Sequence, residues 1–212
     1  MTGMTTEADR ALPLRERKKL RNRRALADAA LRLFTERGFD ATTLEELADE
    51  AEVSKSTFSR IFPAKEAPGI EAEAELWTAY LATLAERQLS GLVLEELHEA
   101  LAETIEGLDP GWVERFVATR RLIAAEPALI RYVEHYRAEI KEQVATLLAA
   151  KLGLGPDDLR PHLLVEITVT AFSMTGRRWL YKEGQRDRAA LLDGLADAIK
   201  AVPASLTLTA PS

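Results

Sequence analysis

Cysteine is absent from the 212-residue sequence, so disulfide bonds, thiolate metal ligands and thiol nucleophiles are all excluded. No stretch reaches the roughly 18 apolar residues that a membrane-spanning helix requires, and the charged N-terminus lacks the apolar core of a signal peptide. Glycine and proline are sparse, with 11 and 9 residues. Because 47% of the residues are hydrophobic, the chain can bury a substantial core. We therefore expect a soluble, cytoplasmic protein.

Residues that carry catalytic or metal-binding chemistry are also few. The three histidines, His98, His135 and His162, are scattered, and neither an HExxH motif nor a glycine-rich phosphate loop is present. The many carboxylates fall on polar helix faces, where solvation explains them. The sequence therefore predicts no enzyme, no metal site and no cofactor.

Charge is distributed unevenly along the chain. The net charge is -6, but residues 1–67 carry 13 basic and 12 acidic side chains, so the excess of acid lies in the remainder. Eight basic residues and one acid fall within residues 10–24. This pattern indicates an end that binds DNA and an end that does not. The alternative is a solvated helix terminus.

Helical periodicity accounts for the whole chain, and no strand pattern is present. A first helix is expected over residues 15–37, closed by Gly38. Thr43 and Glu46 form a capping box for a second helix of about eight residues, and Ser54 caps a third that ends before Pro63. The fourth helix begins between residues 64 and 69, where Pro68 predicts a bend or a later start.

Five further helices follow. One covers residues 94–105, the next opens at Asp109-Pro110, another opens at Pro127, and the last two span about 161–182 and the residues after Asp187. The tail from residue 203 onward is expected to be frayed. We predict an all-α fold of about nine helices.

Two very short helices joined by residues 51–54 are unstable alone and must pack on another helix. That arrangement predicts a helix-turn-helix, whose second helix can enter the DNA major groove. The large apolar side chains form its shared core: Phe34, Leu47, Val53, Phe58 and Phe62. The outward positions carry small donors and cations, which suit phosphates and base edges: Lys55, Ser56, Thr57, Ser59 and Arg60.

Helix N-termini offer further phosphate contacts, because their first N–H groups have no partner in the helix. Three such ends begin at Thr43, at Ser54 and at residues 64–65, where Lys65 adds a charge. Thr43 and Ser54 can also be caps only, and both roles are compatible.

Residues 24–66 read RALADAALRLFTERGFDATTLEELADEAEVSKSTFSRIFPAKE and closely resemble the DNA-binding domain of the TetR/AcrR family. The shared features include Gly38-Phe39, Val53-Ser54 and Thr57-Phe58. Glu52 stands where the family usually has glycine, which predicts a strained turn. Ser59 and Ile61 replace side chains that often contact phosphate in the family. We expect compensating contacts from an arm of arginines, Arg21, Arg23 and Arg24, which could reach the minor groove.

The resemblance implies a DNA-binding transcription regulator, namely an effector-responsive repressor that binds a palindromic operator as a homodimer. The alternatives are an activator or a regulator without a small-molecule effector. The expected organisation is a basic flexible arm over 1–19, a helix-turn-helix domain over 20–67 with its motif at 43–62, a helical effector-binding and dimerisation domain over 68–202, and a tail over 203–212.

Residues 163–181 are apolar on nearly every side, so one face can pack on the core of the chain and another on a partner chain. The resemblance implies that the last two helices pair with their copies in a four-helix dimer interface. The interface residues expected are Ile167, Leu191, Leu195 and Ile199. The alternative is a thicker monomer core. The effector pocket is expected among the aromatic residues and one methionine of the helical body, which could equally be plain core. Its candidate residues are Trp77, Tyr80, Trp112, Phe116, Tyr132, Tyr136, Phe172 and Met174.

Overall fold

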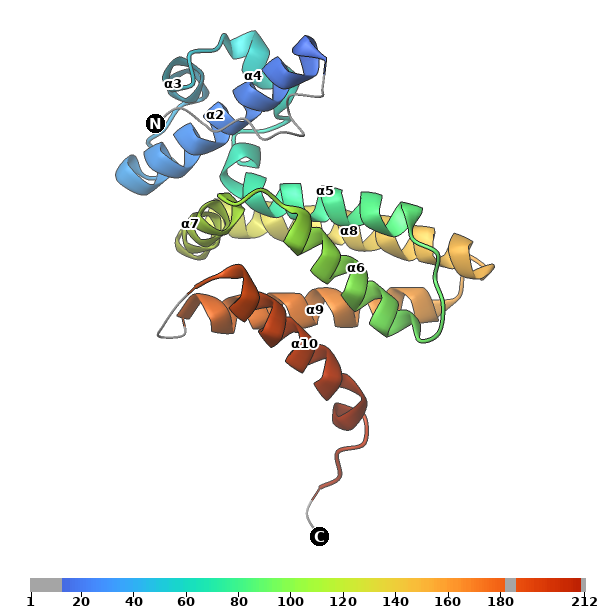
Figure 1. Cartoon of the computed structure of the whole chain (residues 1–212). Coiled ribbons are helices and arrows are strands. Elements are labelled where there is room, and N and C mark those ends of the chain that lie inside the picture. The colour runs from blue at the N-terminus through green and yellow to red at the C-terminus, as the bar shows by residue number, and fades with distance from the viewer. Residues whose placement is uncertain (1–12, 182–185, 211–212) are drawn as a thin grey trace. The chain divides into compact units, whose positions relative to one another are not determined.

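The computed structural model describes residues 13–181 and 186–210, and every regular element in these ranges is a helix. Nine α-helices and one short 3-10 helix are present there, which confirms the predicted all-α fold (Figure 1). The chain divides into two compact units. Unit 1 contains the described residues up to Ala74 together with Glu114–Glu134. Unit 2 contains Glu75–Val113 and the described residues from His135 onward.

Unit 1 is built around α2 (Leu14–Arg37), on which the short helices α3 (Leu44–Glu50) and α4 (Lys55–Ile61) pack. It also contains η1 (Ala67–Ile70), the first turn of α5 (Glu71–Glu86), most of α7 (Trp112–Ala125) and the start of α8 (Pro127–Leu152). The buried residues of α2 begin at Leu26, so its basic first turns lie outside the core. Phe34, Leu47, Phe58 and Phe62 are buried, as predicted, whereas Val53 is only half-buried.

The two short helices are positioned by their caps. The Thr43 hydroxyl accepts the Glu46 N–H at 3.1 Å, and the Glu46 carboxylate accepts the Thr43 N–H at 2.7 Å, which confirms the capping box. The Ser54 hydroxyl accepts the Thr57 N–H at 3.2 Å. Between the helices, Glu52 has a φ of 52°, a left-handed conformation that confirms the strain expected there.

Pro68 delays the helix that follows. Residues Ala67–Ile70 form a 3-10 turn with proline at its start, and α5 begins only at Glu71. Proline lacks the N–H that a later helical position would need, so the late start is the outcome expected from the sequence.

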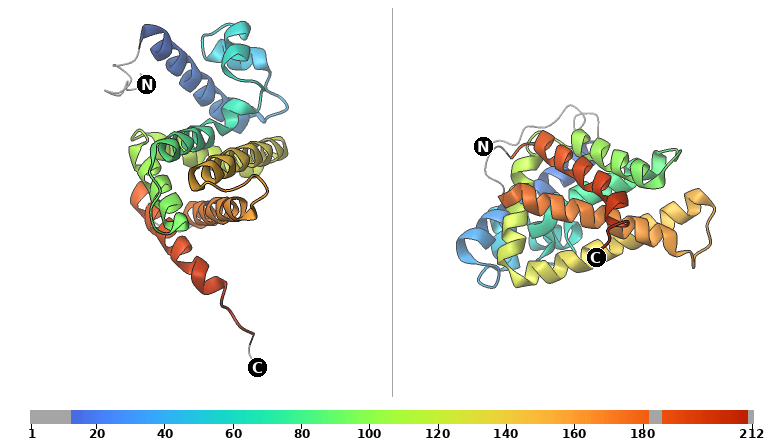
Figure 2. Two further views of the ribbon diagram at one scale, coloured as in Figure 1. Left: turned by 90° about the vertical axis from the view of Figure 1, so that its right-hand side faces the viewer. Right: turned by 90° about the horizontal axis from the view of Figure 1, so that it is seen from below.

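Unit 2 contains the rest of α5 and of α8, with α6 (Val93–Gly107), α9 (Leu159–Tyr181) and α10 (Arg188–Ser205). Helix α10 packs on α9 and α6 and crosses α9 obliquely (Figure 1), as a second view also shows (Figure 2). At the crossing with α9, the Thr175 hydroxyl donates to the Gly194 carbonyl at 3.2 Å. A Cβ at Gly194 would stand 2.9 Å from the Thr175 methyl carbon, so glycine permits this close approach.

Several expected boundaries differ from the structure. Residues 14–19 are the first turns of α2 rather than a flexible arm, and residues 1–12 of that arm lie outside the described part of the chain. The expected helix-turn-helix domain ends at residue 67, whereas unit 1 continues to residue 74 and also contains residues 114–134. Helix α10 continues through Pro203 to Ser205, so the tail begins later. The expected helix end at residue 182 lies outside the described residues.

Candidate nucleic-acid interface

Helix α4 has one buried side and one exposed side. Phe58 is 0% exposed and anchors the helix to unit 1. The side chains predicted to face outward lie on the opposite side: Lys55, Ser56, Ser59 and Arg60 are exposed and Thr57 is half-buried. A helix of this size, with small donors and cations on one side, suits a major groove.

A chain of hydroxyl groups runs along the start of α4. The Ser54 hydroxyl lies 2.9 Å from the Ser56 hydroxyl and 2.9 Å from the Thr57 hydroxyl, and Arg60 donates to Thr57 at 3.4 Å. Ser54 is therefore a cap and also a member of this polar edge. Hydroxyl groups both donate and accept, so the edge can bind phosphate oxygens or base edges.

The net negative charge of the helix-turn-helix motif is unfavourable for binding to DNA phosphates. Residues 43–62 carry five carboxylates and only two cations, Lys55 and Arg60. Lys55 is paired with Glu45 of α3, and this ion pair lowers the pKa of the Glu45 carboxyl. The attraction to phosphate must therefore come from elsewhere in unit 1.

The first turns of α2 supply basic side chains outside the core. Arg15, Lys18, Lys19 and Arg21 are all exposed there. Only Arg21 of these four was among the predicted contacts. The other three belong to the basic run within residues 10–24, which predicted a DNA-binding end of the chain. Nothing in the sequence showed which members of that run would be DNA contacts.

Lys65 has a structural role that the sequence did not predict. Its ammonium group donates to the Phe39 carbonyl at 2.6 Å and lies 4.1 Å from the centroid of the Phe39 ring. The Phe39 ring packs on Phe34, with centroids 5.1 Å apart. Lys65 therefore holds the turn that follows α2. A phosphate contact stays a prediction for its remaining N–H groups.

The three predicted arm arginines differ in their surroundings. Arg21 is exposed, Arg24 is half-buried with contacts inside the protein, and Arg23 is paired with Glu71. All three lie in α2, not in an arm. The minor-groove contact of Arg23 stays a prediction, and in the chain itself its guanidinium binds an internal carboxylate, Glu71 of α5.

Five of the eight residues predicted to line an effector pocket are buried in the interior: Trp77, Tyr80, Trp112, Phe116 and Phe172. The Trp77 ring packs against Phe172 and Tyr80, with centroids 5.2 and 5.8 Å away. The Tyr80 hydroxyl donates to the Leu97 carbonyl at 3.2 Å, and burial raises its pKa. Tyr132 and Tyr136 are half-buried, and Met174 is exposed. The helical spacing of these aromatic residues therefore corresponds, for the five buried ones, to packing in the core.

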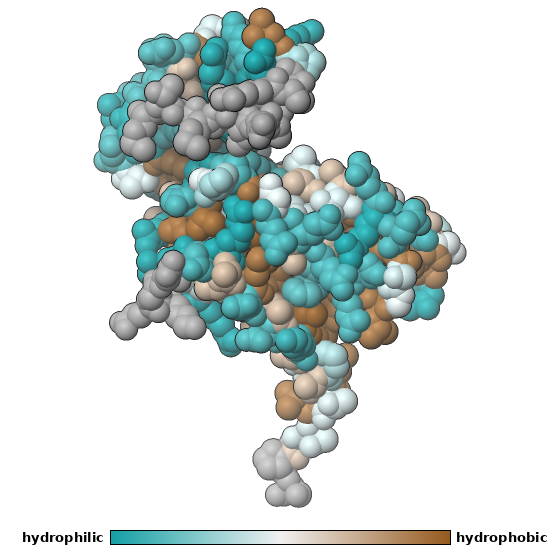
Figure 3. Space-filling view, viewed as in Figure 1, coloured by the Kyte–Doolittle hydropathy of each residue, from teal (hydrophilic) through white to brown (hydrophobic). Residues whose placement is uncertain are grey.

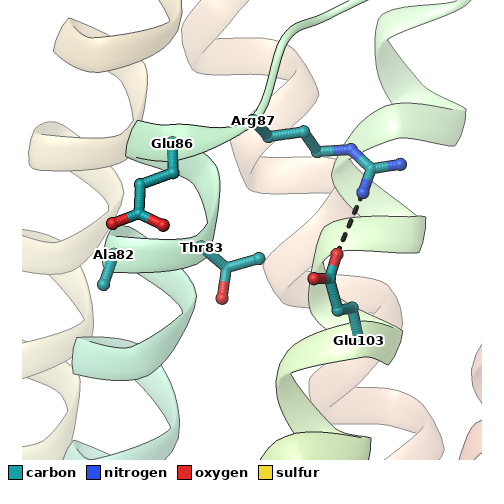
Figure 4. A pocket seen from close by; sticks show the side chains of 5 residues that line it. All are labelled: Ala82, Thr83, Glu86, Arg87 and Glu103. Atoms are coloured by element: carbon teal, nitrogen blue, oxygen red, sulfur yellow. Dashed lines mark hydrogen bonds and ion pairs between the residues drawn. The ribbon is translucent and has the colours of Figure 1, made fainter.

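A hollow of about 430 Å³ opens between α5 and α6 in unit 2, and four of its five lining residues are polar or charged (Figure 4). Arg87 donates to Glu96 at 2.7 Å and to Glu103 at 3.1 Å and is also paired with Glu99. The hollow is lined by Ala82, Thr83, Glu86, Arg87 and Glu103. None of these belongs to the predicted pocket.

Three of the four predicted dimer-interface residues face the interior of their own chain. Leu191 and Leu195 are completely buried and Ile199 is nearly so, because this side of α10 packs on α9 and α6. Their part in a dimer interface stays a prediction, which burial within the single chain does not support. Ile167 is half-buried.

A different apolar stripe is open on α9. Leu159 and Leu163 are 71% and 60% exposed. Their spacing places them on one face of the helix with half-buried Ile167 and exposed Met174 and Tyr181, a face that exposed Thr170 and Arg177 share. Leu206 and Leu208, after α10, are also exposed, and apolar surface is visible at this end of the chain (Figure 3).

Two other kinds of site are absent from the part of the chain that the structure describes. No group of three or more side chains is arranged to hold a metal ion there. None of the helices described is both long and apolar enough to span a lipid bilayer.

Comparison with known proteins agrees with this geometry. Residues 26–67 match the model for bacterial regulatory proteins of the tetR family, and residues 91–204 match the MftR C-terminal domain. The HTH-type transcriptional regulator TcmR of Streptomyces glaucescens is 29% identical over 184 residues, which are 84% of this chain and 81% of TcmR. GusR of Salmonella enterica, at 18% identity, covers 88% of this chain and 96% of its own with a TM-score of 0.51. It shares the fold.

Proposed function

Because the chain belongs to the tetR family of bacterial regulatory proteins, and is a DNA-binding transcription regulator rather than an enzyme, we propose that it is an effector-responsive repressor. It binds a palindromic operator as a homodimer. The observation that carries the proposal is the exposed side of α4, where Ser56, Ser59 and Arg60 stand opposite the buried Phe58.

Each part of the DNA contact has its own support. The polar edge of α4 supplies donors and acceptors for base edges. The basic first turns of α2 supply charge for the flanking phosphates, which the motif itself lacks. The caps Thr43 and Ser54 each take one first-turn N–H group of α3 and α4, and the other first-turn N–H groups are proposed for further phosphate contacts.

The dimer is proposed to use the apolar stripe of α9, with the same stripe of a second copy as its occupant. A two-fold interface brings one patch against itself, so a single exposed stripe is enough. A short recognition helix reads few base pairs, and two copies related by two-fold symmetry read a palindrome. Leu159, Leu163 and Met174 are the exposed apolar residues that this contact would cover.

The response to an effector is proposed to pass through α5. This helix is continuous from Glu71 to Glu86, so its first turn belongs to unit 1 and the remainder to unit 2. A small molecule that binds unit 2 and displaces α5 would change the support of the DNA-binding helices. A ligand shifts such an equilibrium only by its different affinities for the two states.

In vitro selection from random duplexes tests the DNA contact. We expect the wild-type chain to select a palindrome, and Arg60→Ala to lose roughly tenfold or more in affinity for it, as for one good base contact. Arg121→Ala removes the same charge from an exposed position on α7 and should bind as wild type does.

Selection of no duplex at low salt, or equal affinities for the Arg60 and Arg121 variants, would contradict the proposed interface. Transcript levels from a promoter that carries the selected palindrome then distinguish repression from activation. A repressor lowers those levels when it occupies the promoter.

A further inference from the structure

Arg23 joins three helices through one guanidinium group. Its Nη2 donates to Glu71 Oε2 at 2.7 Å, and its Nε is bonded to the other oxygen of the same carboxylate. Its Nη1 donates to the Ile61 carbonyl at 3.3 Å, and the guanidinium carbon lies 4.6 Å from the centroid of the Phe62 ring. Arg23 belongs to α2, Ile61 and Phe62 form the end of α4, and Glu71 opens α5.

The contacts suit a fixed position better than a mobile one. The Arg23 and Glu71 side chains are only 33% and 14% exposed, so water screens the pair less than it screens a surface pair. Two parallel N–H bonds to one carboxylate define the angle as well as the distance. The carbonyls at the end of a helix have no partner within that helix, and Arg23 satisfies the one at Ile61.

We propose that Arg23 is a positioning residue for DNA recognition, which holds the C-terminal end of α4 against the first turn of α5. This inference rests on the proposed DNA contact of α4. It differs from the minor-groove contact expected from the sequence, because the guanidinium is directed at protein groups. It also gives α5 a direct link to the recognition helix, since Glu71 is the first residue of α5.

Removal of the Glu71 charge separates the two roles. If Arg23 served as a phosphate contact, Glu71→Gln would free its charge and bring DNA closer, so affinity would rise. If Arg23 positions α4, Glu71→Gln loosens the recognition helix, and affinity falls by roughly threefold to thirtyfold, the range for residues that act through neighbours. The probe is the duplex that the wild-type chain selects.

Three single arginine variants and one double variant complete the test. Arg23→Lys keeps the charge but loses the two-pronged geometry, so we expect it to bind as weakly as Glu71→Gln. Arg23→Gln should leave the salt dependence of binding unchanged. Arg21→Gln, two residues away and exposed, should reduce the slope against log salt by about one. The double variant Arg23→Gln/Glu71→Gln should be no weaker than either single variant.

Hydrogen exchange provides a readout that needs no DNA. The Phe62 N–H donates to the Phe58 carbonyl at 2.8 Å in the last turn of α4, and the Gly38 N–H donates to the Phe34 carbonyl at 3.0 Å at the end of α2. We expect faster exchange at Phe62 and unchanged exchange at Gly38 in Glu71→Gln. A variant that unfolds would accelerate both.

Tighter or equal DNA binding by Glu71→Gln, wild-type binding by Arg23→Lys, or unchanged exchange at Phe62 would each overturn the proposal. Failure of the wild-type chain to select any duplex is a separate result, since it would refute the DNA contact of α4 itself. The two failures are therefore distinguishable.

Discussion

At the scale of single residues, Glu52 shows the effect of a side chain at the position in the turn where the family usually has glycine. Its φ of 52° lies in the region that a side chain disfavours. The turn keeps this conformation because the Val53 N–H donates to the Ala48 carbonyl at 2.9 Å and Ser54 caps the next helix. The local geometry of the motif thus tolerates the strain of one residue.

We expect Glu52→Gly to stabilise the protein against urea by about 0.5–1 kcal/mol. Relief of the left-handed strain, about 1–2 kcal/mol, is offset in part by the greater freedom of glycine in the unfolded chain. Asp49→Gly, inside α3, is the control and should be destabilising. Equal effects of the two glycines would show that Glu52 is not strained.

His98 should make stability depend on pH. Burial lowers its pKa; Glu99 opposes that shift and Lys200 adds to it. Its Nδ1 is buried and has no hydrogen-bond partner among the described residues. The unfolded chain therefore takes up a proton at a higher pH than the folded chain does, so stability is greatest above about pH 6.5 and falls as the pH drops below it.

Melting temperatures at pH 7.5 and 5.5 measure this effect. His98→Gln should lose less stability on acidification than the wild-type chain does, because its side chain does not titrate. Parallel pH profiles for the wild-type chain and His98→Gln would rule the explanation out.

Local rules allowed some site residues to be predicted and left others open. The capping roles of Thr43 and Ser54 depend on neighbours three residues away, so the sequence contains the information. The roles of Arg23 and Lys65 depend on Glu71 and Phe39, which are distant in sequence. A cation that binds phosphate and one that binds a carboxylate look the same until the fold brings their partners together.

At the scale of elements, periodicity predicted where the helices lie but not what covers their faces. The stripe of Leu191, Leu195 and Ile199 has the same spacing whether a second copy or the chain itself covers it. In the structure α9 and α6 cover it. The close crossing of α9 and α10 at Gly194 could not be predicted either, because it depends on how two helices cross.

The Gly194 contact leads to a prediction about this crossing. Gly194→Ala should destabilise the protein by about 1–2 kcal/mol, because overpacking against Thr175 outweighs the gain of about 1 kcal/mol in helix propensity. In a Thr175→Ser background the methyl group is gone, so the same change should become stabilising. Urea unfolding of the four proteins measures both effects, and an effect of the same sign in both backgrounds would count against the contact.

At the scale of the whole molecule, the assembly depends on the apolar stripe of α9. Leu163 is exposed in the single chain, so a charge there leaves the core of the subunit intact. We expect Leu163→Glu to be folded but monomeric by sedimentation equilibrium, and to lose roughly a hundredfold or more in affinity for the palindrome once binding is no longer bivalent. Leu92→Glu, at an exposed position of unit 2 just before α6, should remain dimeric.

A wild-type chain that sediments as a monomer would refute the proposed assembly. A Leu163→Glu protein that remains dimeric would instead show that another surface forms the interface. Unchanged helical content in far-ultraviolet circular dichroism must accompany either result, so that loss of folding is not mistaken for loss of assembly.

The surplus of carboxylates in residues 43–62 also affects how the protein searches a chromosome. Sliding along a duplex depends on sequence-independent attraction to phosphates. Only two cations lie in that segment, and Glu45 neutralises one of them, so this attraction is weak where the recognition helix meets DNA. We expect short scanning runs and frequent dissociation, so that the protein reaches its target mainly by hopping between distant stretches of the genome.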